Sequence, residues 1–194
     1  LPEQTEESFT DTVQKLLTLR PDRIALYGYA HVTWKTKVQK SLERHALPSP
    51  QTRIKLFLLA LKSLLEAGYI YIGMDHFALK NDALLIAKKN ETLHRNFMGY
   101  TTTNTEVLIG LGVSAISDVF YGFRQNVKTV EEYYEAIANQ VLPIYKGIDV
   151  SEEDIIYRKH ILNIACKGKT NWQQKFVLTD EMKNKLSSLQ NDGI

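Results

Sequence analysis

The chain has 194 residues, and its 24 Lys and Arg residues nearly balance its 22 Asp and Glu residues, so its formal net charge is only +2 at pH 7. This balance argues against a nucleic-acid-binding protein, whose surface is usually strongly basic. No apolar run in the sequence approaches the roughly 20 residues of a membrane-spanning helix, and no secretory leader is recognisable. A single cysteine excludes a disulfide framework within the chain and fits a reducing compartment. We therefore expect a cytoplasmic protein.

Helical and strand patterns alternate along the first half of the sequence. Phe9, Val13 and Leu16 share one face of a helix, and Ser49 followed by Pro50 is a typical helix start. The expected elements, in order, are a helix at 5–19, a strand at 23–29, a helix from 49 to the glycine at 68, a strand at 69–74 and a short helix near 82–89. This order of helix, strand, helix and strand predicts parallel βα units.

Two capping signals stand out in the second half of the sequence. Thr129 with Glu132, and Ser151 with Asp154, each have the spacing of a capping box, which opens a helix. We expect, in order, a strand at 107–111, a helix at 129–139, a linker at 143–149, a helix from 151 to about 166, a short strand at 175–178 and a final amphipathic helix at 179–190. The expected fold class is therefore α/β.

Leu93–Ser117 is the stretch with the most unusual composition. It combines a histidine, an arginine, aromatic residues, a run of threonines and several glycines, and it has few aliphatic residues at its start. Such a segment would be costly to bury without polar partners, so it is either a solvated loop or part of a functional site. The residues at 110–115, GLGVSA, resemble a dinucleotide-binding loop only superficially, because the third glycine and the following acidic residue are missing.

Polar residues also follow both strands expected in the first half. His31 comes after the first of these strands, and Asp75 and His76 come after the second. Barrel enzymes build their active sites at this carboxyl edge of the strands. We therefore expect Ala30, His31, Asp75, His76 and Phe97 to lie on one edge of one sheet.

Four separated motifs occur in a fixed order along the chain. They are YAHV at 29–32, IGMDHFA at 72–78, LHRNF-x-GYTT at 93–102 and GLGVSAIS at 110–117. In this combination the sequence resembles the C-terminal half of oxygen-independent coproporphyrinogen III oxidase, a radical S-adenosylmethionine (SAM) enzyme family of haem biosynthesis. The resemblance extends from Leu1 to about Cys166.

The resemblance implies a fold and an activity. The fold would be the later βα units of an incomplete TIM-like radical-SAM barrel over residues 1–142, followed by the start of a mostly helical, winged-helix-like domain over residues 143–194. In such an enzyme two propionates of coproporphyrinogen III are oxidatively decarboxylated to vinyl groups, which gives protoporphyrinogen IX. The implied cofactors are SAM and a [4Fe–4S] cluster, and the implied partners are SAM and coproporphyrinogen III.

The chain departs from this family in its cysteines. The family holds its cluster with a C-x3-C-x2-C run near the N-terminus, and cluster ligation takes three or four thiolates. This chain has only Cys166, which ends an apolar helical pattern and is expected to be a small packing residue. We therefore expect no cluster and no activity from the chain alone. Because it begins Leu1-Pro2 without a methionine, we also expect it to continue a longer protein.

The resemblance also assigns roles to individual residues. Ala30 and Ile116 match positions that contact SAM, although both also fit ordinary packing. Phe97 and Met98 match a Phe-Gln pair beside the active site, so they are expected to form a wall of the cavity, the alternative being an exposed apolar pair. Met98 lacks the amide of the usual glutamine. The remaining residues expected to line the cavity or hold its loops are His31, Asp75, His76, His94 and Arg95.

Other interpretations of these residues stay open. His31, His76 and His94 could in principle bind a metal, but no two of them have helical spacing, so no metal site is predicted. Asp75 equally fits a turn cap. A non-enzymatic haem- or tetrapyrrole-binding module, like the related haem chaperones, is the alternative function, and the MDHFA and LHRNF motifs favour the oxidase. The strand expected at 23–29 would have an open edge, which predicts a homo-oligomer.

Overall fold

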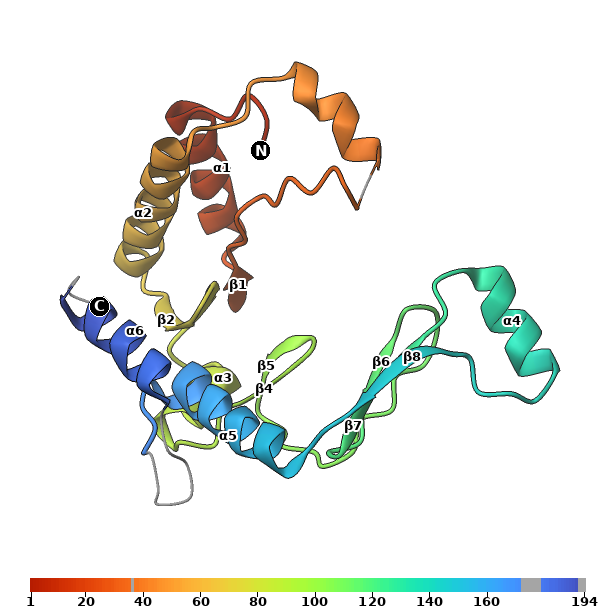
Figure 1. Cartoon of the computed structure of the whole chain (residues 1–194). Helices are drawn as coiled ribbons and strands as arrows, with labels where there is room; N and C mark the ends of the chain where they lie inside the picture. The colour runs from red at the N-terminus through yellow and green to blue at the C-terminus, as the bar shows by residue number, and fades with distance from the viewer. Residues whose placement is uncertain (36, 172–178, 192–194) are drawn as a thin grey trace. The chain divides into compact units, whose positions relative to one another are not determined.

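The computed structural model describes residues 1–35, 37–171 and 179–191 of the chain (Figure 1). The chain forms two compact units, Leu1–Leu93 and His94–Ile194. Both units contain helices and strands, as expected for the α/β class. Among the described residues, no helix is both long and apolar enough to cross a membrane. The division between the units lies after residue 93, whereas the domain boundary expected from the sequence lies after residue 142.

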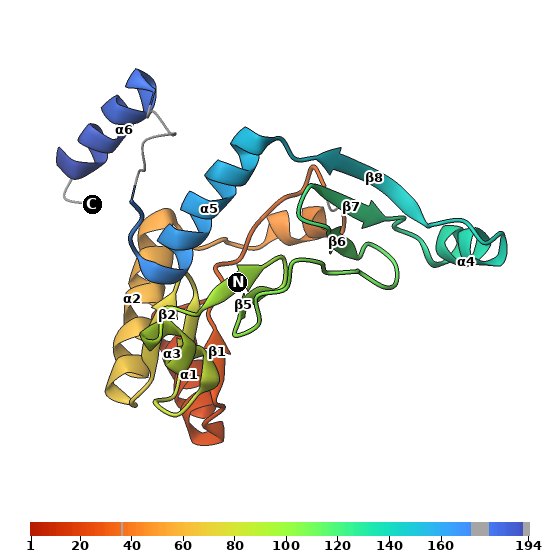
Figure 2. The same ribbon diagram turned by 90° about the horizontal axis from the view of Figure 1, so that it is seen from below.

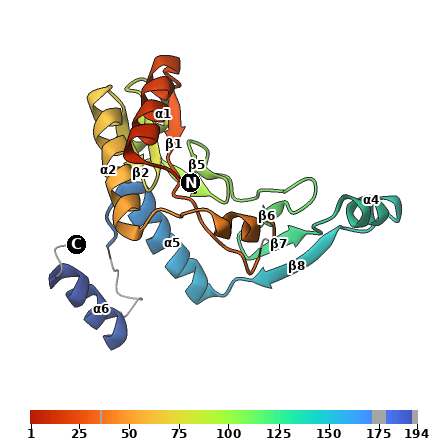
Figure 3. The same cartoon turned by 90° about the horizontal axis from the view of Figure 1, so that it is seen from above.

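The first unit combines helices with one small sheet. Its described elements are α1 at Glu6–Leu19, β1 at Arg23–Ala25, the 3-10 helix η1 at Lys37–Arg44, α2 at Pro50–Glu66, β2 at Ile70–Gly73, β3 at His76–Ala78 and α3 at Ala83–Lys89. The strands form a sheet in the order β1-β3-β2. Helices α1 and α2 lie side by side (Figures 1 and 3).

A compact hydrophobic core joins this sheet to the two long helices. Its buried members are Ile24 of β1, Leu64 of α2, Phe77 of β3, and Tyr69, which directly precedes β2. The hydroxyl of Tyr69 donates a hydrogen bond to the carbonyl of Pro21 at 2.6 Å, so its polar end is satisfied inside the core. The core therefore holds β1 and β3, the strands next to the expected site residues, against the long helices.

Local capping explains why the helices begin where they do. Thr5 and Ser8 form a capping box at α1, and the hydroxyl of Ser49 accepts the backbone N–H of Thr52 at 3.1 Å at α2. Asp82 caps α3 by accepting the N–H of Leu84 at 2.7 Å. The helices expected at 5–19, from 49 and near 82–89 are thus confirmed.

The cap of α2 supports a first testable prediction. Replacing Ser49 with alanine removes the acceptor for the Thr52 N–H, so the free energy of unfolding of the Ser49→Ala chain should be about 1 kcal/mol lower. Urea denaturation followed by circular dichroism measures this difference. Ser49→Asp is the matched control, since aspartate caps equally well. Equal stability of Ser49→Ala and the natural chain would contradict the assigned cap.

The expectation of parallel βα units in the first unit is wrong. Strand β3 pairs antiparallel with β1 and with β2, and it lies between them. The chain reverses after β2 through Met74, whose φ of 48° is in the left-handed region. Methionine seldom adopts this conformation, so no glycine or asparagine signals the turn, and the pattern at 69–78 suggested one strand and a loop. Since β1 and β2 both oppose β3, they run in the same direction.

The second unit contains a hairpin, a three-stranded sheet and three described helices. The hairpin pairs β4 at His94–Asn96 with β5 at Gly99–Thr101, and the sheet has the antiparallel order β6-β7-β8, with β6 at Ile116–Asp118, β7 at Gly122–Asn126 and β8 at Ile144–Asp149. The helices are α4 at Val130–Ala138, α5 at Glu152–Lys167 and α6 at Asp180–Asn191. Helix α4 follows the end of the sheet (Figure 2).

Two expectations for the second unit are corrected by the structure. The linker expected at 143–149 is instead strand β8, which pairs with β7, and the strand expected at 107–111 contributes only a single bridge between Leu108 and Asp118. Both errors concern pairing between distant segments. The helices expected at 129–139, at 151–166 and at 179–190 are confirmed as α4, α5 and α6. The strand expected at 175–178 lies outside the described residues.

Candidate functional site

The expected site residues lie in both units. Ala30, His31, Asp75 and His76 belong to the first unit, and the second unit holds His94, Arg95, Phe97, Met98 and Ile116. Phe97 therefore does not lie on the sheet of the first unit, which corrects the expectation that it shares an edge with Ala30 and His31. Each group has its own local geometry.

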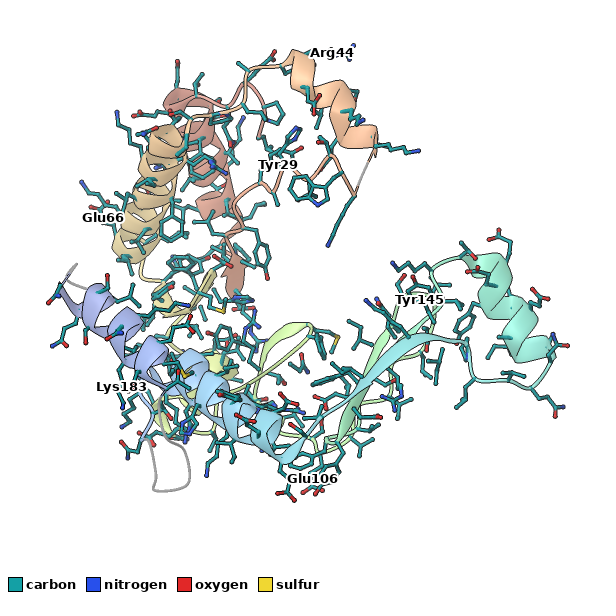
Figure 4. The ribbon with its side chains drawn as sticks, viewed as in Figure 1. Tyr29, Arg44, Glu66, Glu106, Tyr145 and Lys183 are labelled. Atoms are coloured by element: carbon teal, nitrogen blue, oxygen red, sulfur yellow. The ribbon has the colours of Figure 1, made fainter. Side chains whose placement is uncertain are left out.

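The segment after β1 is held by a glutamine of η1. The side-chain oxygen of Gln39 accepts the backbone N–H of Val32 at 2.8 Å, and its amide nitrogen donates to the carbonyl of Ala30 at 3.1 Å. Tyr29, which is labelled in Figure 4, lies in this segment. Its hydroxyl lies 3.2 Å from Nδ1 of His31, and Nε2 of His31 lies 3.8 Å from a carboxylate oxygen of Glu43. Gln39 was not identified from the sequence, because a lone glutamine in a polar segment carries no signal.

A pocket of about 780 Å³ opens beside this segment. Its walls are residues 26–32 together with side chains of α1 and α2, among them Phe9, Arg53 and Phe57. The exposed residue Ala30 and the half-buried His31 both line it. The pocket is thus large enough for a small-molecule ligand and has a mainly apolar lining with one cation.

Asp75 and His76 lie next to the segment that follows β1. The carbonyl of Asp75 accepts the N–H of Leu26 at 2.8 Å, and the His76 ring meets the Tyr27 ring edge to face with centroids 6.0 Å apart. Burial raises the pKa of Tyr71, and the nearby Asp75 carboxylate adds to this effect. The structure therefore places Asp75 and His76 beside the segment that follows β1. It does so because β3, which begins at His76, pairs antiparallel with β1.

Phe97 and Met98 form the tip of the β4-β5 hairpin. The side chain of Asn96 accepts the N–H of Met98 at 2.9 Å, which closes the turn. Phe97 is 55% exposed and Met98 is 80% exposed. The Phe97 ring contacts Phe123 edge to face, with centroids 5.2 Å apart. In the described chain the pair is an exposed apolar tip, anchored on one side by Phe123.

His94 and Arg95 occupy the half-buried strand β4, next to α5. Burial lowers the pKa of His94, the Arg158 guanidinium lowers it further, and the Asp118 carboxylate opposes this shift. The Arg95 guanidinium lies over the Tyr100 ring, 5.5 Å from its centroid, and its buried Nε has no hydrogen-bond partner among the described residues. Arg95 is thus a cation held on an aromatic face.

Cys166 on α5 has the environment of a packing residue. It is 5% exposed, and burial raises the pKa of its thiol, an effect that the charges of Arg95 and Lys167 partly offset. The thiolate is the reactive and metal-binding form of cysteine. The structure therefore supports the structural role expected from the sequence.

Ile116 lies in a glycine-rich segment that is tied down by polar side chains. The amide of the buried Asn126 donates to the carbonyls of Gly110 at 3.1 Å and Gly112 at 2.8 Å, and the N–H of Gly112 donates to the Tyr133 hydroxyl at 3.1 Å. A Cβ added to Gly110 would stand 2.8 Å from the carbonyl oxygen of Ile116. The glycine therefore permits a close approach of two backbones.

Neither a metal nor a cluster site is assembled in the described residues. Within them, no group of three or more His, Cys, Asp or Glu side chains is arranged to hold a metal ion. His31 and His76 belong to one unit and His94 belongs to the other. The only cysteine of the sequence is Cys166, so a [4Fe–4S] cluster does not fit the ligands present in this chain.

Comparisons with known proteins identify relatives that match most of the chain. No protein-family model matches it. It is 40% identical over 174 residues to the oxygen-independent coproporphyrinogen III oxidase of Synechocystis. This match covers 90% of the present chain and 37% of the relative. It is also 37% identical over 172 residues to the Escherichia coli protein of the same name, covering 89% of this chain and 38% of the relative.

A solved structure supports the same relationship. The Escherichia coli coproporphyrinogen III oxidase, described as a radical SAM enzyme, matches with a TM-score of 0.89 and 35% identity, over 100% of this chain and 46% of that one. The chain thus spans less than half the length of the relatives that it matches. From its sequence and its structure, the chain is a homologue of the C-terminal part of oxygen-independent coproporphyrinogen III oxidase.

Proposed function

We propose that the chain supplies the C-terminal part of an oxygen-independent coproporphyrinogen III oxidase. The enzyme as a whole would decarboxylate two propionates of coproporphyrinogen III to vinyl groups. The observation that carries this proposal is the match of the chain, along its length, to relatives of that name in both sequence and structure. The finer architecture proposed is that β1 and β2, which run in the same direction although β3 lies between them, belong to the later part of a TIM-like barrel, with residues 143–194 beginning a mostly helical domain.

The proposed role of this chain is to hold and shape part of the cofactor and substrate cavity. Bound SAM, with a cluster whose ligands lie outside this chain, would supply a radical that abstracts hydrogen from the substrate. Ala30 and Ile116 would contact SAM. Two contacts support these roles. The Gln39 amide donates a hydrogen bond to the Ala30 carbonyl, and Gly110, which has no side chain, lets its backbone lie close to that of Ile116.

The other proposed residues would form the substrate wall. Phe97 and Met98 present an exposed apolar tip that could cover a tetrapyrrole face. Arg95 offers a guanidinium suited to a propionate carboxylate. The histidines and Asp75 would hold the surrounding loops by hydrogen bonds, for which the contact of His31 with Tyr29 is an example.

A chimera provides the test of the proposed function. The Synechocystis relative is rebuilt with the 194 residues of this chain in place of its own matching segment, and its release of 5′-deoxyadenosine and consumption of coproporphyrinogen III are measured under argon. We expect an active chimera, and we expect Ile116→Asp to abolish SAM cleavage while the cluster remains. A chimera that folds and holds its cluster but never cleaves SAM would overturn the proposal. Haem titration followed in the Soret band tests the tetrapyrrole-binding alternative.

The open edge of the first sheet leads to a prediction about association. β1 lies at the edge of the sheet order β1-β3-β2, so one side of Arg23–Ala25 has no strand partner among the described residues. Exposed edges favour pairing with another chain. We expect the isolated chain to form a homodimer or larger oligomer at micromolar concentration, measured by sedimentation equilibrium. A proline in β1 would block this pairing between chains. Ala25→Pro is the better variant for this purpose, because Ala25 is exposed, whereas Ile24→Pro would also damage the core. A monomer of 22.2 kDa would contradict the prediction.

A further inference from the structure

A charged pair ties the sheet of the second unit to α5. Arg158 of α5 donates from Nη1 to Oδ1 of Asp118 at 2.9 Å and from Nη2 to Oδ2, so the two side chains form a bidentate fork. Asp118 is 8% exposed and also accepts the N–H of Phe120 at 3.2 Å. A carboxylate this buried is retained only with such partners, so the pair is a fixed point of the unit.

Aromatic rings extend this fixed point to the hairpin tip. The Arg158 guanidinium lies 5.3 Å from the centre of the Phe123 ring and 5.9 Å from that of Phe120. Phe123 in turn contacts Phe97 edge to face. The orientation of Phe97, which is otherwise exposed, therefore depends on a ring that Arg158 holds.

His94 lies within the electrostatic reach of the same pair. Arg158 from α5 and Asp118 from β6 are the charged groups that act on its ring. On its own strand the next residue is Arg95, whose guanidinium is turned over the Tyr100 ring. On β5 the residue paired with His94 is the uncharged Thr101. The titration of His94 is therefore sensitive to the charges of this pair, and the ring contact of Phe97 is sensitive to its geometry.

We propose that Asp118 and Arg158 are positioning residues that orient Phe97 through the Phe123 ring, so that the hairpin tip offers a ring face to a flat ligand. A pyrrole ring of the substrate is such a ligand, and in that respect the inference rests on the proposed function. The apolar face of the ligand would lie on Phe97.

The charges of the pair predict opposite effects on His94. Arg158 lowers the pKa of His94 and Asp118 raises it. Arg158→Met should therefore raise the pKa of His94, because the cation is lost, and Asp118→Asn should lower it further, because the carboxylate is lost. Loss of structure would instead move both values toward that of a free histidine. The two signs thus separate positioning from simple destabilisation.

The experiment is an NMR pH titration of the imidazole carbons in the full 194-residue chain. Alongside it, the nuclear Overhauser effect between the Phe97 and Phe123 rings reports the orientation of Phe97. We expect the pKa of His94 to rise in Arg158→Met and to fall in Asp118→Asn. In Arg158→Lys, which keeps the charge but loses the fork, the ring contact should weaken while the pKa of His94 stays close to that of the natural chain.

A matched control comes from a second pair in the same unit. Arg124 donates to Asp149 at 2.6 Å on the β7-β8 side, and Asp149 is exposed, so Asp149→Asn should change neither the His94 titration nor the ring contact. Equal signs for the two charge-removing variants, or an unchanged ring contact in Arg158→Lys, would overturn the inference. Because the readout needs no catalysis, it remains decisive if the chimera proves inactive.

Discussion

Reconstitution of the isolated chain with iron and sulfide under argon is expected to give no reducible [4Fe–4S] signal in electron paramagnetic resonance, and no cleavage of SAM. The physical reason is the number of thiolates, because a cluster needs three or four and the sequence has only Cys166. Even this thiol is a poor ligand, since it is buried and burial raises its pKa. The expected effect is the complete absence of radical chemistry from the chain by itself.

Two controls make this result decisive. The full-length Synechocystis relative, treated in the same way, should acquire a cluster, which shows that the reconstitution works. Cys166→Ser should behave like the natural chain, because the cysteine has no role in ligation. A stoichiometric cluster on the natural chain that disappears in Cys166→Ser would show that copies of the chain share their cysteines around one cluster, and it would refute the prediction.

Gly110→Ala is expected to destabilise the second unit by about 1–3 kcal/mol, the usual cost of forcing extra atoms into a packed site. The added Cβ would stand 2.8–2.9 Å from the backbone nitrogen, carbon and oxygen of Ile116. No flexible side chain can yield there, so the β6 backbone has to move. Urea denaturation measures the loss of stability, and loss of SAM cleavage in the chimera measures the displacement of Ile116.

Gly28→Ala is the matched control for this substitution. A Cβ at Gly28 meets nothing within 4 Å, and the residue does not require a left-handed backbone. Its stability should remain the same or increase slightly, because alanine restricts the unfolded chain. If Gly110→Ala is as stable as Gly28→Ala, the close approach between Gly110 and Ile116 does not constrain the segment.

The helices and the resemblance to a family could be recognised from the amino-acid sequence alone. Caps act over three residues, so Ser49, Thr129 and Ser151 could be recognised from their immediate neighbours, and α2, α4 and α5 begin where these residues predicted. The four motifs likewise carried the resemblance to the oxidases without any knowledge of pairing. Information of both kinds is contained in short, continuous stretches of chain.

The strands, and the residues that hold the candidate site in place, depend on how distant segments of the chain pair in the folded protein. Strand β8 forms because residues 144–149 find β7 about twenty positions away, and β3 forms because a methionine adopts a left-handed turn that composition does not signal. Asp118 and Arg158 are 40 positions apart, and Asn126 reaches back to Gly110 and Gly112. Such contacts depend on which segments meet in space, and their residue types alone are compatible with many surface roles. The motifs therefore revealed which residues form the candidate site, and the folded chain revealed what holds them.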